Sequence, residues 1–151
     1  MMDALEKPAP LADYPVVIKL PIQWGDQDAF GHVNNTVAVR WYESARIAYL
    51  EQSGLSHLMD ANGLGPILAA IGCNYRRHMH YPDQVLVGAR VDSIGRTSMV
   101  MGHVVFSLKQ NQITADGTST VVMFDYAANR PRRMPPELRE AFERVEGKPL
   151  G

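Results

Sequence analysis

The second half of the chain alternates hydrophobic and polar residues with a period of two. In the clearest stretch, Val85, Val87 and Ala89 are separated by Leu86, Gly88 and Arg90. Successive side chains of a strand point to opposite faces, so this pattern predicts a sheet with one solvated face. Short turn sequences separate the segments, which favours antiparallel neighbours. The predicted strands are residues 66–81, 83–94, 97–110 and 112–128, preceded by a first strand at 16–24.

A single long helix is predicted between the first two of these strands, at residues 36–52. No proline or glycine interrupts this range, and Trp41, Ala45 and Tyr49 recur at helical spacing. Apolar residues also lie off that stripe, for example Val39. We therefore expect a helix that is covered on most of its sides.

Capping residues mark both ends of this helix. Asn34 or Asn35 is placed to cap its start, and Ser53 with Gly54 ends it. Residues 55–65 then have the character of an irregular connection.

The order of elements indicates an α+β fold in which a sheet curves around one buried helix. Residues 14–130 form the expected domain, and residues 1–13, which contain no continuous apolar run, are expected to be a flexible N-terminal arm. Residues 131–151 form a C-terminal extension. Two prolines open a short helix there, and Leu138 and Phe142 mark its apolar face.

Composition and charge exclude several classes of protein. The formal net charge of the 151 residues is -1, which provides no field to attract nucleic acid or an anionic membrane. No run of about 18 apolar residues is present to cross a membrane, and the N-terminus lacks the apolar core of a signal peptide. Cys73 is the only cysteine, which fits a reducing compartment. We expect a soluble cytoplasmic protein with neither a nucleic-acid nor a membrane partner.

One polar run stands out between the first strand and the helix. It reads Gln23-Trp24-Gly25-Asp26-Gln27-Asp28-Ala29-Phe30-Gly31-His32-Val33-Asn34-Asn35 and is followed by Trp41-Tyr42-Glu43 and Ala45-Arg46. This run resembles the hydroxybenzoyl-CoA and acyl-CoA thioesterase family of hot-dog proteins. The resemblance extends more loosely over residues 16–128. It implies the hot-dog fold, a five-stranded antiparallel sheet wrapped around one long central helix.

The resemblance also implies the roles of individual residues. Asp28 matches the catalytic carboxylate of the family, and the backbone amide near Asn35 matches the donor that polarises the thioester carbonyl. His32 is placed to hydrogen-bond the carboxylate or to orient water, and Asn34 to position the loop or the carbonyl. Each has a structural alternative, as a turn residue, a hydrogen-bonding residue or a helix cap.

The candidate residues permit hydrolysis without a metal. Amides at a helix N-terminus, expected here at residues 35–37, stabilise negative charge on a carbonyl oxygen. The Asp28 carboxylate suits the role of nucleophile as well as that of general base. Asp26, in contrast, is expected to hold the loop.

Further residues are expected to bind substrate. These are Thr36, Tyr75, Arg76 and Arg77, with the arginines suited to the phosphates of coenzyme A. Arg130, Arg132 and Arg133 have the same chemistry, although for each single arginine the sequence favours a solvated strand edge or linker over phosphate binding. His78 and His80 would share one face of the predicted strand, but no third ligand has a suitable spacing, so we expect no metal site.

The predicted function is hydrolysis of an acyl-CoA to the free acid and coenzyme A, with no cofactor beyond the coenzyme A of the substrate. Acyl-carrier-protein thioesters are a close variant. A non-catalytic acyl-thioester-binding dimer and a hot-dog dehydratase are alternatives, but Asp28 and the order of the motif favour hydrolysis. Members with tyrosine at the second asparagine bind an aromatic acyl group, and this chain has Asn35. A homodimer or homotetramer is expected, because family members pair two sheets edge to edge.

Overall fold

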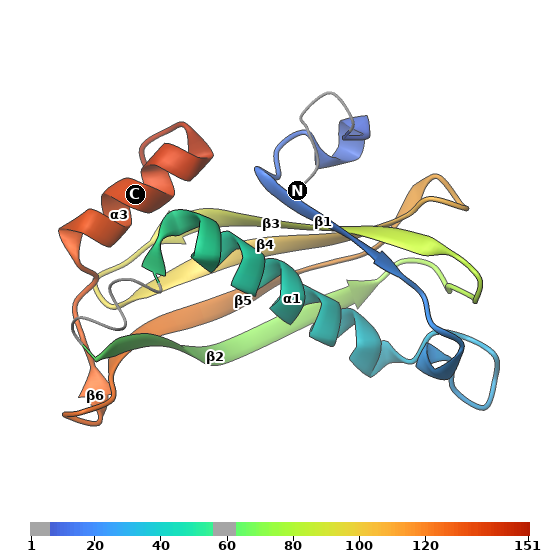
Figure 1. Ribbon diagram of the computed structural model, residues 1–151, viewed down its shortest axis with the longest axis horizontal. Helices are drawn as coiled ribbons and strands as arrows, with labels where there is room; N and C mark the ends of the chain where they lie inside the picture. Colours follow the sequence, from blue (N-terminus) through green and yellow to red (C-terminus); the bar gives the residue numbers. More distant parts are fainter. Residues whose placement is uncertain (1–6, 56–62) are drawn as a thin grey trace.

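The computed structural model describes residues 7–55 and 63–151. Its main sheet is antiparallel with the strand order β1-β3-β4-β5-β2, and α1 lies across one face of it (Figure 1). The strands are β1 (Val16–Pro21), β2 (Leu64–Tyr75), β3 (Gln84–Ile94), β4 (Ser98–Ser107), β5 (Gln112–Asp125) and the short β6 (Arg130–Pro131), which pairs with β5. The helices are α1 (Asn35–Ser53) and α3 (Pro136–Glu146). The predicted hot-dog fold is confirmed.

The central helix α1 is held by its caps and by the core. Of the two predicted capping residues, Asn34 is the N-cap. Gly54 ends the helix in the left-handed conformation, with a φ of 85°. Tyr42, Ala45 and Tyr49 are fully buried against the sheet. Burial of a large side chain contributes about 1.5–3 kcal/mol relative to exposure, so packing rather than helix propensity stabilises α1.

Both faces of the sheet carry apolar side chains. Val85, Val87 and Ala89 face α1 in the main core, whereas the alternate residue Leu86 belongs to a second cluster on the outer face. The prediction of one solvated face is therefore wrong for this part of the sheet. The N-terminal segment covers it.

Residues 7–15 supply that cover. A turn of 3-10 helix (Ala9–Leu11) places Leu11, which is fully buried, beside Tyr14 in the outer cluster. Gly88 makes room for this packing, since an added Cβ would lie 2.9 Å from Cγ of Tyr14. The described part of the expected flexible arm thus contributes a side chain to the packed domain.

The segment after β2 differs from the prediction. The strand expected at 66–81 begins at Leu64 and ends at Tyr75, because Arg76 N and Arg77 N both donate to the Thr114 carbonyl and break the ladder. Residues 76–83 are an irregular connection. The first strand likewise ends at Pro21 rather than Trp24. Most of the irregular connection predicted at 55–65 lies outside the described residues.

The C-terminal helix α3 packs against α1 and β3. Leu138 and Phe142 of its predicted apolar face are fully buried, and the Phe142 ring lies 5.9 Å from that of Tyr49. Glu146 Oε2 accepts hydrogen bonds from the Tyr49 hydroxyl at 2.6 Å and from Val91 N at 3.0 Å. The C-terminal extension is therefore part of the core structure.

Candidate active site

Asp26 fixes the loop that follows β1. Asp26 is only 6% exposed, and its carboxylate accepts hydrogen bonds from Gln23 N at 2.8 Å and from Arg40 Nη2 at 3.0 Å. The first bond is part of a capping box around a turn of 3-10 helix (Trp24–Asp26). Both carboxylate oxygens are therefore engaged, which confirms the expectation that Asp26 holds the loop.

Asp28 has the opposite environment. Asp28 is exposed and lies in a tight turn. In this turn Asp28 N donates to His32 O at 2.8 Å, and Gly31 N donates to Asp28 O at 3.0 Å. Gly31 has a φ of 80°, which favours glycine at this position. Asp28 Oδ1 accepts from Phe30 N at 2.8 Å. The other oxygen, Oδ2, has no hydrogen-bond partner among the described residues, so it is available for chemistry.

The N-terminus of α1 presents one unpaired amide beside this carboxylate. Asn34 Oδ1 accepts from Thr36 N, and Asn34 O accepts from Val37 N, each at 3.0 Å. Within the described chain no acceptor pairs with the amide of Asn35. Of the amides predicted at 35–37, this one remains free to polarise a carbonyl, with the positive end of the helix dipole behind it.

A cavity of about 230 Å³ lies at this point. It brings together six of the predicted site residues, although they come from the loop, α1, β2 and the 76–83 connection. Its lining residues are Asp28, His32, Val33, Asn34, Asn35, Ala38, Tyr75, Arg77, His78, Met79 and Thr114. The Tyr75 hydroxyl closes one side by donating to Asn35 O at 2.6 Å.

Two predicted substrate-binding residues do not line this cavity. The hydroxyl of Thr36 donates to Asn34 Oδ1 at 3.0 Å and so belongs to the helix cap. The Arg76 guanidinium forms two bonds of 3.0 Å with Asp116, and they are the main reason why the pKa of that carboxyl lies below its usual value. Arg77, in contrast, borders the cavity and forms no salt bridge with another described residue.

Several lining residues were not predicted. Thr114 reaches the cavity from β5, and Met79 and His78 reach it from the irregular connection. The sequence pattern places His78 and His80 on a strand, but in the structure neither residue lies on a strand. The rings of His78 and His80 instead lie 4.0 and 4.9 Å from the ring of His32. No local sequence signal links these residues, because their contacts join distant segments.

Among residues 7–55 and 63–151, no three His, Cys, Asp or Glu side chains are grouped so as to hold a metal ion. No helix in the same part of the chain has the length and hydrophobicity of a membrane span. Arg130, Arg132 and Arg133, at and after β6, do not line the cavity. Cys73 on β2 is also absent from its lining, and its sulfur lies 3.3 Å from the Tyr42 hydroxyl.

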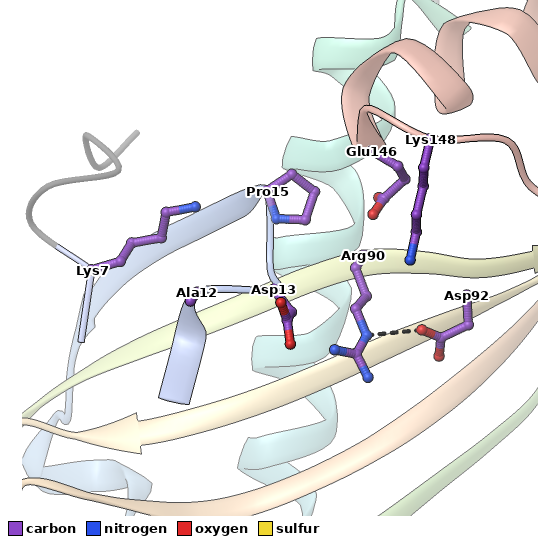
Figure 2. Close-up of a pocket in the computed structure, with 8 residues that line it drawn as sticks. All are labelled: Lys7, Ala12, Asp13, Pro15, Arg90, Asp92, Glu146 and Lys148. Carbon is purple, nitrogen blue, oxygen red and sulfur yellow. Dashed lines mark hydrogen bonds and ion pairs between the residues drawn. The ribbon is translucent and has the colours of Figure 1, made fainter. Parts of the chain in front are cut away.

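A larger cavity, of about 590 Å³, lies between the N-terminal segment, β3 and the end of α3 (Figure 2). Its charged side chains are partly paired with one another, as in the 2.8 Å bond between Arg90 Nε and Asp92 Oδ1. Its Glu146 carboxylate is already bound to Tyr49 and Val91. No residue of the polar run lines it, so the smaller cavity is the candidate active site.

Comparisons with known proteins agree with this site. Residues 22–142 match the model of the thioesterase-like superfamily. The chain is 27% identical over 118 residues to the long-chain acyl-CoA thioesterase FadM of Escherichia coli. The matched region covers 78% of this chain and 89% of FadM. A thioesterase from Thermus thermophilus, solved with coenzyme A and Zn, has a TM-score of 0.81 and 30% identity, over 91% of this chain and 98% of that one.

A thioesterase superfamily protein from Jannaschia sp. CCS1 has a TM-score of 0.82 and 26% identity, over 98% of this chain and 91% of that one. The family match, over residues 22–142, includes the loop with Asp28 and the start of α1. The chain therefore belongs to the thioesterase-like superfamily and is a thioester hydrolase of the hot-dog fold.

Proposed function

We propose that this protein hydrolyses acyl-CoA thioesters at the cavity between Asp28 and the N-terminus of α1. One observation carries the proposal. The unpaired Oδ2 of Asp28 and the unpaired amide of Asn35 belong to residues that border the same cavity. A carbonyl placed between them would meet a hydrogen-bond donor on its oxygen and a carboxylate, or a water activated by it, at its carbon.

Asp28 supports two routes with the same products. As a general base, it takes a proton from water, whose oxygen attacks the carbonyl carbon. As a nucleophile, its own oxygen attacks and forms a mixed anhydride that water then hydrolyses. In both routes the carbon–sulfur bond breaks and the thiolate of coenzyme A leaves and takes up a proton. Neither route needs a metal or another cofactor.

Two further parts of the proposal rest on neighbouring residues, and a third rests on similarity to a known enzyme. His32 and Asn34 orient water and the loop, and Tyr75 and Arg77 bind substrate at the cavity wall. The unpaired guanidinium of Arg77 suits a phosphate of coenzyme A. The similarity to FadM supports coenzyme A as the carrier and a long acyl chain as the first substrate to test.

We also propose that the protein acts as a cytoplasmic homodimer. The strand order leaves β2 at one edge of the sheet, where Leu68, Ala69 and Ala70 are exposed. A long apolar edge strand is a pairing surface unless it is blocked. A second copy that pairs along β2 would cover this edge beside Tyr75, which lines the cavity.

The first experiment measures free thiol release from short, medium, long and aromatic acyl-CoAs and from an acyl-carrier-protein thioester. We expect turnover of at least one acyl-CoA, and a loss of about 10²–10⁴-fold in kcat for Asp28→Asn, because the amide can neither attack nor take a proton. Asp92→Asn is the control, since that carboxylate lies in the other cavity.

The outcomes separate the alternatives. If thiol were released only from the carrier-protein thioester, the acyl carrier protein, and not coenzyme A, would be the carrier of the substrate. Binding of acyl-CoA without release would mean that the chain is a non-catalytic acyl-thioester-binding protein. An unchanged kcat in Asp28→Asn would remove that carboxylate from the reaction.

A further inference from the structure

The loop that carries Asp28 has little support of its own. We call residues 27–33 the catalytic loop. Ala29, Phe30 and Gly31 at its tip are exposed, and Phe30 is 86% exposed, so burial of the tip does not hold the loop in place. Its internal bonds shape the turn but do not attach it to the sheet. Apart from the anchor that Asp26 provides just before it, its position over the cavity depends on contacts with another segment.

That segment is the connection between β2 and β3, residues 76–83, which we call the clamp segment. Three hydrogen bonds join the two along their length. Val33 N donates to Met79 O at 2.8 Å, and Tyr81 N donates to Gln27 Oε1 at 3.1 Å. Between them, the ring nitrogen Nδ1 of His80 lies 2.8 Å from the Gly31 carbonyl oxygen.

The His80 bond has a defined direction. A carbonyl oxygen only accepts, so Nδ1 of His80 must carry the hydrogen. The bond is therefore available to the neutral tautomer with a proton on Nδ1 and also to the doubly protonated ring. It holds the catalytic loop at Gly31, a residue in the left-handed backbone conformation.

His32 is enclosed by the same segment. Its ring is tilted by 32° against that of His78, with 4.0 Å between centroids, and meets the ring of His80 edge on at 4.9 Å. His32 and His78 both line the cavity, whereas His80 does not. The clamp segment thus sets the position of a cavity wall as well as that of the loop.

The clamp segment is itself fixed to the sheet. Gln110 Nε2 donates to His78 O at 2.8 Å, and the Asp83 carboxylate accepts from Lys109 N at 3.0 Å and from the Ser107 hydroxyl. At its start, Arg76 N donates to Thr114 O at 2.8 Å. The catalytic loop is therefore attached through the clamp segment to β4 and β5, the middle of the fold.

From these contacts we infer that His80 is a positioning residue for thioester hydrolysis. Its Nδ1–H holds Gly31, and with it the turn that carries Asp28 at the edge of the cavity. The inference rests on the proposed function of Asp28. Small displacements of a reacting group cost about 10²-fold in rate, so this one bond has a measurable effect.

Three substitutions separate the hydrogen bond from the ring. His80→Asn keeps a donor close to the place of Nδ1, His80→Phe keeps a ring beside His32 but has no donor, and His80→Ala has neither. We expect His80→Ala and His80→Phe to lower kcat by about 10–100-fold with little change in KM, and His80→Asn to restore most of it. The melting temperature of each variant tests whether the fold is kept.

A second measurement does not depend on activity. Amide hydrogen exchange of residues 28–33 should be faster in His80→Ala and His80→Phe than in the wild type and in His80→Asn. If the wild type releases no thiol from any substrate, the proposed function fails while the exchange data still test the clamp. An asparagine variant as impaired as alanine, or an alanine variant with wild-type kcat and exchange, would overturn the role of His80.

Discussion

Asp26 and Asp28 lie two positions apart, yet their carboxylates face different surroundings. Asp26 is buried and bonded by Gln23 and Arg40, which stabilises the loop. Asp28 is exposed and keeps one oxygen free of partners in the described chain. Removing the first carboxylate should weaken folding, whereas removing the second should weaken chemistry. In the proposed function, two identical side chains therefore serve different purposes, Asp26 in structure and Asp28 in the reaction.

His103 offers a prediction for stability against pH. Its ring is fully buried between α1 and the sheet, stacked 4.8 Å from the Tyr42 ring, with Nε2 at 2.8 Å from the Ser119 hydroxyl. Burial, followed by the charge of Arg46, lowers its pKa from 6.5 to about 4. Between these values the unfolded chain binds a proton that the folded chain does not, so the free energy of unfolding falls as the pH falls.

The pKa change corresponds to a loss on the order of 3 kcal/mol from pH 7 to pH 4. Urea unfolding at pH 7, 5.5 and 4.5 measures it, with His103→Gln as the comparison, because glutamine can still bond Ser119 but does not titrate. We expect the wild type to lose more stability than the variant over this range. If the free energy of unfolding changed with pH in the same way in both proteins, His103 would not be the source of the pH dependence.

At the scale of elements, the start of α1 supplies the proposed hydrogen-bond donor for the thioester carbonyl. Asn35 is the first residue of the helix, where proline is well tolerated because its missing N–H has no helical partner. Asn34 before it has ψ 142°, which suits a residue that precedes proline. A substitution at this position can therefore remove a single amide from the active site.

We expect Asn35→Pro to lower kcat by about 10²–10³-fold through loss of that donor, with a melting temperature close to that of the wild type. Asn35→Ala is the matched control, since it keeps the amide and should keep most of the activity. Thiol release and thermal unfolding measure the two effects. Normal turnover by the proline variant would show that the thioester carbonyl does not bind at the Asn35 amide.

Local pattern predicted the elements well where periodicity decides them. α1 and β3 begin and end within one residue of the predicted ranges, since hydrophobic spacing and capping residues mark their ends. The polar run indicated Asp28 and Asn35 by family resemblance, and both residues border the candidate cavity. Residues 76–81, which the pattern predicts as strand, instead belong to the irregular connection, because backbone bonds to Thr114 end β2. The contact behind the proposed role of His80 has no local sequence signal, because its partner Gly31 is 49 residues away.

At the scale of the whole molecule, the free edge of β2 leads to a prediction for assembly. We expect sedimentation at micromolar concentration to show a homodimer. Leu68→Lys together with Ala70→Lys should shift it toward monomer, since lysine on an edge strand blocks pairing. The control, Gln112→Lys, adds a charge at an exposed position at the start of β5. A monomeric wild type with full activity would contradict the proposed dimer.

The covered outer face of the sheet limits how copies of this chain can stack. Two sheets that pack back to back need bare apolar surfaces, but here Leu11 and Tyr14 already occupy part of that surface. A chain trimmed before Tyr14 would expose Leu86 and Phe106 to neighbouring molecules. Oligomers of such a shortened protein would form through this newly exposed apolar face, so the native assembly should be measured on protein that keeps residues 7–15.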